Sequence, residues 1–105
     1  MSHTIAIDQS TSATKAMLFD QQCRLLARAD KEHRQYYPQT GWVEHDAEEI
    51  YHNMVEVIKS LTADPSFKSG GETSICITNQ RETVVVWNRH TGKPVSRAIV
   101  WQDTR

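Results

Sequence analysis

The sequence predicts a mixed α/β fold with the element order β-β-β-α-β-β-β, formed by residues 1–105 as part of one domain. Three observations predict it. Short apolar runs separated by polar turns fill the first 30 residues, one stretch near the middle has helical periodicity, and β-branched runs follow Gly71. A chain of 105 residues has the size of a single domain.

The N-terminal part of the chain predicts three short strands. Apolar residues at 5–7 end in the polar stretch 8–12, and a second apolar run at 16–19 ends in the polar stretch 20–22. Residues 23–29 alternate loosely and form the third strand of a meander joined by tight turns.

One helix is predicted after a polar loop at residues 30–41. Asp46 is a favoured N-cap, and Glu49 stands three residues later, as in a capping box. Apolar residues then recur at helical spacing and form one apolar face: Ile50, Met54, Val57, Ile58 and Leu61. The Asp-Pro pair at 64–65 ends this helix.

The remaining segments predict strands at residues 74–77, 83–87 and 95–101, with a hairpin connection at 88–94. The first and last of these runs are apolar on both faces, as in a sheet that is covered on both sides. One helix covers one face only, so we expect parts outside these residues to complete the core. The alternative is a small domain that dimerises through its open face.

Composition excludes several classes of protein. The net charge is −1, from 12 basic and 13 acidic residues, so no basic excess favours nucleic acid. No apolar run approaches the ~20 residues of a membrane span, and the N-terminus does not resemble a signal peptide. Cys23 and Cys76 match no metal or redox spacing and are expected to be reduced, partly buried thiols of a cytoplasmic protein. The five histidines share no zinc-ligand spacing.

The first cluster with chemical potential is the polar segment 8–15. Asp8 ends a buried strand, where a carboxylate suits a hydrated Mg²⁺ ion. The Ser- and Thr-rich turn offers backbone N–H groups and hydroxyls to phosphate oxygens, and Lys15 adds positive charge. The alternative is an ordinary polar hairpin turn.

The second cluster, residues 78–83, directly follows the apolar run 75–77. Ligands of open α/β sheets bind beyond the carboxyl ends of strands. Arg81 and Glu82 there offer hydrogen-bond donors and acceptors to a polyol, although a surface ion pair would also explain them.

The segment 41–46 is interpreted structurally rather than chemically. Gly41 permits a turn, Trp42 is expected to be buried, and Asp46 caps the helix. The tyrosines at 36–37 are expected to pack the preceding loop.

Taken together, these motifs resemble the N-terminal part of the FGGY family of carbohydrate kinases, most closely its glycerol kinase branch. The matching stretches are IDQSTS at 7–12, GWVEHD at 41–46, and ITNQRET at 77–83 with its continuation TGKP at 91–94 and AIVWQDTR at 98–105. The resemblance covers nearly all 105 residues, and the stretch from residue 77 is its most diagnostic part.

The resemblance implies an actin-like, ribonuclease-H-like ATPase fold with two domains, of which this chain is the N-terminal part of the first. It implies transfer of the ATP γ-phosphoryl group to glycerol or a related polyol, with Mg²⁺, in a cytoplasmic enzyme that forms a homo-oligomer. The family's general base and adenine pocket lie further along such chains, so residues 1–105 alone are expected to be inactive.

The resemblance also implies roles for single residues. Asp8 holds Mg²⁺ at the phosphates and is the one catalytic position within this chain. The implied cofactor-binding residues are Thr11, Ser12, Ala13 and Lys15. The implied substrate-binding residues are Arg81, Glu82 and Trp101.

Several alternatives remain open from the sequence. One is an FGGY paralogue that acts on another sugar, and a second is a non-kinase ATPase or sensor of the same fold. A third is a small β-rich interaction module. A ribonuclease-H-type nuclease would need several convergent carboxylates, of which only Asp8 is well placed.

Overall fold

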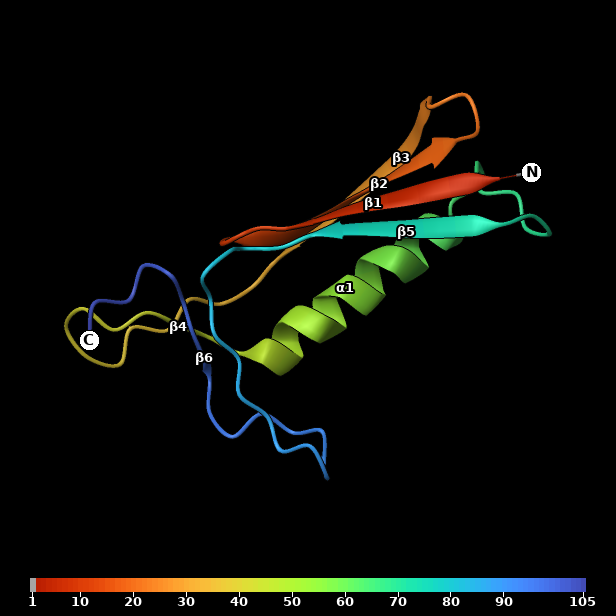
Figure 1. Ribbon diagram of the computed structural model, residues 1–105. Coiled ribbons are helices and arrows are strands. Elements are labelled where there is room, and N and C mark those ends of the chain that lie inside the picture. Colours follow the sequence, from red (N-terminus) through yellow and green to blue (C-terminus); the bar gives the residue numbers. More distant parts are fainter. Residues whose placement is uncertain (1) are drawn as a thin grey trace.

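Three consecutive strands form the predicted meander in the computed structural model, which describes residues 2–105 (Figure 1). They are β1 (His3–Gln9), β2 (Ala13–Asp20) and β3 (Leu25–Glu32), paired antiparallel in sequence order. A fourth strand, β5 (Thr73–Thr78), pairs parallel with β1, so the sheet is mixed and has the order β3-β2-β1-β5. The predicted α/β class is therefore confirmed.

The helix α1 (Ala47–Thr62) begins at the predicted cap. The Asp46 carboxylate accepts hydrogen bonds from the N–H groups of Glu48 and Glu49 at 3.0 and 3.4 Å. The Glu49 carboxylate accepts from the N–H of Arg34 at 3.3 Å and so ties the preceding loop to the helix start.

The core lies between α1 and the meander, because the helix packs across β2 and β3 (Figure 1). Its buried residues alternate along the strands and recur every three or four residues on the helix. They are Ile5, Ile7, Ala16, Leu18, Val57 and Leu61. No helix within the described residues covers the opposite face of the sheet, where Met17 is 37% exposed.

The edge strand β5 is more exposed than predicted. Ile75 and Ile77 are 49% and 55% exposed, because β5 lies beyond the strands that α1 covers. Cys76 on the same strand and Cys23 are free and exposed, so the expectation of partly buried thiols was wrong.

A second, small sheet pairs β4 (Glu44–His45) with β6 (Ala98–Ile99). The predictions of strands at 83–87 and 95–101 were too long. Val84 exchanges both backbone hydrogen bonds with Ile99, and Trp87 forms one bridge with Pro94, but the valines 84–86 are exposed and do not form a continuous ladder. Their β-branched side chains favour extended backbone, yet these side chains stay 39–56% exposed within residues 2–105.

The loop before β4 departs from the prediction in two residues. Trp42 is half-buried rather than buried, and Tyr37 is 67% exposed rather than packed into the loop. Gly41 takes a φ of +81°, as its predicted turn requires, and a Cβ there would lie 2.6 Å from the Thr104 hydroxyl.

Within residues 2–105, α1 has neither the length nor the apolar character of a membrane span.

Candidate functional site

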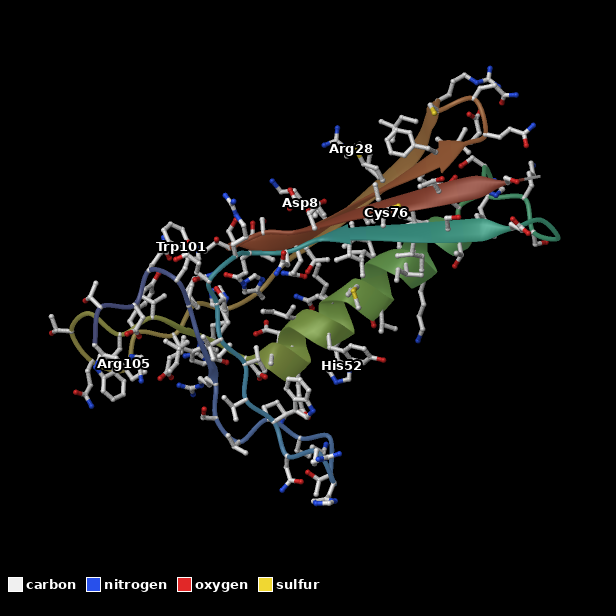
Figure 2. All side chains as sticks on the ribbon, in the orientation of Figure 1. Asp8, Arg28, His52, Cys76, Trp101 and Arg105 are labelled. Atoms are coloured by element: carbon white, nitrogen blue, oxygen red, sulfur yellow. The ribbon has the colours of Figure 1, made fainter. Side chains whose placement is uncertain are left out.

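Asp8 stands near the carboxyl end of β1 with its side chain exposed (Figure 2). The strand register pairs it with Lys15 on β2 and with Thr78 on β5, so the three side chains share the sheet face that α1 does not cover. The Thr78 hydroxyl donates a hydrogen bond to the Asp8 carboxylate at 3.3 Å. A basic group and a hydroxyl therefore flank the carboxylate.

The turn from β1 to β2 is closed by Ser10. Its N–H and its hydroxyl both donate to the carbonyl of Ala13, at 3.0 and 2.8 Å. Within residues 2–105, the N–H groups of Thr11 and Ser12 donate no hydrogen bond. Unpaired N–H groups at the tip of a tight turn can bind an anion.

The second predicted cluster begins where β5 ends. Because β1 and β5 are parallel, their carboxyl ends lie at the same edge of the sheet. Arg81 and Glu82 are exposed in the segment that follows, and Glu82 has a φ of +64°. A glutamate in this left-handed region costs roughly 1–2 kcal/mol, and such residues cluster at functional sites.

A hollow of about 410 Å³ joins the two clusters. Its lining includes five of the predicted site residues: Asp8, Thr11, Arg81, Glu82 and Trp101. Ser10, Asn79 and Gln80 complete it; they lie within the predicted clusters 8–15 and 78–83 but were not named as site residues.

The other three predicted residues do not line this hollow. Ser12, Ala13 and Lys15 line a separate hollow of about 350 Å³. A larger hollow of about 570 Å³ lies between α1 and the hairpin at 88–94, and none of the predicted site residues lines it.

The residues around the 410 Å³ hollow offer complementary chemistry. Arg81 provides hydrogen-bond donors, Glu82 provides acceptors, and the indole of Trp101 provides an apolar surface. No group of three or more His, Cys, Asp or Glu side chains within residues 2–105 could hold a metal ion. A cation at Asp8 would therefore keep water or take oxygens from another molecule, which suits Mg²⁺ rather than zinc.

Trp101 bridges the two sides of the hollow. Its indole N–H donates to the Thr11 hydroxyl at 2.9 Å, and its backbone N–H donates to the Thr83 hydroxyl at 3.3 Å. The indole is thereby fixed between the β1–β2 turn and the segment after β5.

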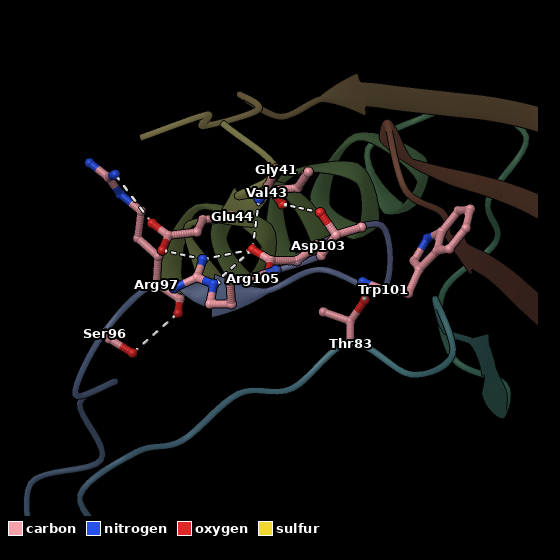
Figure 3. A network of polar contacts seen from close by, with 10 residues as sticks. Gly41, Val43, Glu44, Thr83, Ser96, Arg97, Trp101, Asp103 and Arg105 are labelled. Atoms are coloured by element: carbon pink, nitrogen blue, oxygen red, sulfur yellow. Dashed lines mark hydrogen bonds and ion pairs between the residues drawn. The ribbon is translucent and has the colours of Figure 1, made fainter. Parts of the chain in front are cut away.

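Ionic contacts anchor the segment that carries Trp101 (Figure 3). The guanidinium of Arg105 donates to Asp103 at 2.7 Å and to Glu44 at 2.8 Å, and it lies 3.7 Å above the ring of Trp42. Asp103 also accepts the N–H of Val43 at 2.8 Å. The hydrogen bonds from Arg105 hold the pKa of Asp103 well below its ordinary value, and Asp103 and Glu44 raise the pKa of Arg105.

Gln80 on the lining of the hollow contacts His45, which is fully buried. Its burial, with a smaller contribution from His33, lowers the pKa of the imidazole from 6.5 to about 4. His45 is therefore neutral near pH 7.

Comparison with known proteins bears on this arrangement. Residues 3–105 match the FGGY family of carbohydrate kinases, N-terminal domain. A glycerol kinase of Beutenbergia cavernae is 50% identical over 103 residues, which make up 98% of this chain and 20% of that enzyme. The chain thus spans about a fifth of the length of the curated relatives it matches.

Solved structures of carbohydrate kinases contain the same fold. The crystal structure of Plasmodium falciparum glycerol kinase with ADP has a TM-score of 0.88 and 41% identity, covering 100% of this chain and 21% of that one. A xylulose kinase from Lactobacillus acidophilus has a TM-score of 0.88 at 23% identity, over 98% of this chain and 20% of that one, and shows the fold alone. These likenesses confirm the predicted actin-like ATPase fold. With the family match over residues 3–105, they show that this chain belongs to the FGGY family of carbohydrate kinases.

Proposed function

We propose that this chain is the N-terminal part of an ATP-dependent kinase that phosphorylates glycerol or a closely related polyol. The observation that carries the proposal is the single hollow in which Asp8 and Thr11 face Arg81, Glu82 and Trp101. Glycerol is the favoured acceptor because relatives at 48–50% identity are glycerol kinases.

On the nucleotide side, Asp8 would hold Mg²⁺, and the Thr11–Ala13 turn would bind phosphate oxygens through the unpaired N–H groups of Thr11 and Ser12. Bound Mg²⁺ supplies positive charge that offsets the negative charge of the phosphates. Lys15 adds a second positive charge on the same sheet face as Asp8.

On the acceptor side, Arg81 would donate to hydroxyl oxygens of the polyol and Glu82 would accept from its hydroxyl protons. Trp101 would pack against the carbon chain. These residues orient the acceptor, and the general base that takes its proton would come from outside residues 1–105. Catalysis of this class rests mainly on positioning and charge stabilisation.

The expected compartment and partners are supported by the cysteines and by the charge of the chain. Two exposed, free thiols suit a reducing compartment, in agreement with a cytoplasmic enzyme. The lack of a basic excess gives no support to nucleic acid as a partner. The homo-oligomeric state and the boundary of the domain stay predictions.

The test uses the complete protein that contains residues 1–105, with ADP release measured against glycerol, xylulose, gluconate and no acceptor. Asp8→Asn is expected to lower kcat about 100- to 1,000-fold, because a charged group is lost at the phosphates. Arg81→Ala is expected to raise the KM for glycerol about 10- to 100-fold through a lost charged hydrogen bond.

Arg28→Ala is the matched control, because Arg28 is exposed on β3 and does not line the hollow (Figure 2). Its kinetic constants should equal those of the wild type. ADP release that does not depend on any acceptor would replace the proposal with a non-kinase ATPase. Preference for another sugar would identify an FGGY paralogue, and turnover by residues 1–105 alone would contradict the inferred external base.

A further inference from the structure

Six hydrogen bonds form a closed cycle that includes residues on both sides of the hollow and connects them. We call it the hydrogen-bond cycle. Its members, in order, are Thr11, Gln35, His45, Gln80, Thr83 and Trp101, which returns to Thr11. They come from separate segments: the β1–β2 turn, the loop after β3, β4, and the chain after β5.

His45 is the fully buried member of this cycle and links its two halves. Its Nε2 lies 2.6 Å from the side-chain oxygen of Gln35, and its Nδ1 lies 3.1 Å from the side-chain nitrogen of Gln80. An amide oxygen only accepts, and an amide nitrogen only donates. The contacts therefore assign the proton to Nε2 and leave Nδ1 as the acceptor.

From His45 each branch of the cycle reaches one side of the hollow. Gln35 donates from its side-chain nitrogen to the carbonyl of Thr11 at 3.0 Å, at the tip of the β1–β2 turn. Gln80, which precedes Arg81, accepts from the Thr83 hydroxyl at 3.1 Å, and that hydroxyl accepts from the backbone of Trp101. Each donor in the cycle has an acceptor, so one set of directions satisfies all six bonds.

The surroundings of His45 favour the neutral ring that this assignment needs. His33 lies edge-on at 4.4 Å between ring centroids, and both of its ring nitrogens are buried without a partner in the described residues. Neither Glu44 nor Asp46, the acidic neighbours in the chain, forms an ion pair with the imidazole. A charged imidazole would have a proton on Nδ1 facing the amide N–H of Gln80.

We propose that His45 is a positioning residue, which fixes the β1–β2 turn relative to Arg81 and Trp101 before either substrate binds. This inference rests on the proposed function, because it assigns the turn to phosphate and the other side to the acceptor. Because His45 is fully buried, its two hydrogen bonds are electrostatically stronger than they would be in water. A displacement of about 1 Å between reacting groups lowers catalysis about 100-fold.

The test compares His45→Phe with His45→Gln in the complete protein. Phenylalanine fills the space and makes neither hydrogen bond, whereas glutamine keeps one donor and one acceptor. His45→Phe should lower kcat/KM for both substrates about 10- to 100-fold per folded molecule, and His45→Gln should recover at least half of that loss on a logarithmic scale. His52→Phe, on the exposed side of α1, is the matched control and should change neither (Figure 2).

A second readout does not depend on activity. In NMR spectra of the substrate-free protein, ¹⁵N shifts should show His45 neutral with its proton on Nε2. The indole N–H resonance of Trp101, assigned with Trp101→Phe, should move in His45→Phe and return toward its wild-type position in His45→Gln.

Each outcome decides between the two proposals. If the wild type phosphorylates no polyol but the Trp101 resonance behaves as expected, the proposed function is wrong. The hydrogen-bond cycle would then be confirmed, but its role in positioning groups for catalysis would be rejected. If the wild type is active and His45→Phe keeps its kcat/KM, the positioning role is overturned. Equal losses in His45→Phe and His45→Gln with an unmoved Trp101 resonance would also overturn it.

Discussion

The sheet–helix unit (β1, β2, β3, β5 and α1) and the C-terminal segment (residues 79–105) are stabilised in different ways. In the first, apolar side chains such as Leu18 and Val57 are buried against one another. In the second, Ala98 and Val100 are the buried apolar residues within the described part of the chain, and polar contacts of Trp101 and Arg105 attach the segment to its neighbours. The hollow lies at the boundary, so its geometry depends on directional contacts more than on apolar burial.

The largest expected effect tests the sheet–helix unit. Leu18→Ala removes a side chain that is fully buried under α1 and should lower the free energy of unfolding of residues 1–105 by about 3 kcal/mol. Met17→Ala, one position along β2 on the uncovered face, should cost less than about 1 kcal/mol. Urea unfolding measures both, and equal losses would mean that the uncovered face is also packed.

The second effect concerns pH and the boundary between the two regions. The pKa of His45 is about 4 in the folded protein and 6.5 in the unfolded chain, so the unfolded chain binds more protons between these values. Stability should therefore fall as the pH falls from 6.5 to 4, by up to about 3 kcal/mol. Urea unfolding of residues 1–105 across this pH range, in the wild type and in His45→Gln, measures how the free energy of unfolding depends on pH. This dependence should be weaker in the variant. Parallel curves would show that His45 is already accessible to protons in the folded state.

How much the sequence could predict differs between the same two regions. The meander, α1 and the cap at Asp46 follow from local alternation, helical spacing and one capping side chain, and all were predicted. In the C-terminal segment the hairpin at 88–94 was predicted, but the strands on either side of it were predicted too long, because three valines at 84–86 favour extended backbone whatever their partners are. Whether they form a strand depends on a neighbouring layer that residues 2–105 do not supply.

The candidate site shows the same limit. The two strand ends at Asp8 and Thr78 could be predicted, because an apolar run followed by polar residues is a local pattern. The bridge from Trp101 to Thr11 spans 90 residues and follows from no local signal. Gln35 and His45 were missed for the same reason, since their partners come from separate segments of the chain.

A smaller effect is expected from the ionic anchor of the C-terminal segment. Asp103→Asn keeps an oxygen for the N–H of Val43 but removes the charge that binds Arg105. The melting temperature should fall by a few degrees at low salt and by somewhat less at about 1 M salt, because the Arg105 side chain is 28% exposed and its ion pair with Asp103 is partly screened. Gln102→Ala, at the exposed neighbour, is the control and should be neutral. A loss that does not depend on salt would show that shape, not charge, holds this segment.

The smallest effect returns to the β1–β2 turn, on the sheet–helix side of the boundary. Ser10 closes this turn through its N–H and its hydroxyl, and its φ is not in the left-handed region, so the backbone there does not require glycine. Ser10→Gly should therefore cost about 0.5–1 kcal/mol of stability, through the greater freedom of the unfolded chain. In the complete protein, the kcat/KM of Ser10→Gly for ATP should change less than about threefold. Greater freedom of one turn residue should weaken phosphate binding by no more than about 0.6 kcal/mol, which corresponds to a factor of about three. Steady-state kinetics should show a smaller loss of kcat/KM in Ser10→Gly than in His45→Phe. If Ser10→Gly instead binds ATP much more tightly, the serine side chain obstructs the phosphates, and the turn rather than the hydrogen-bond cycle limits the site.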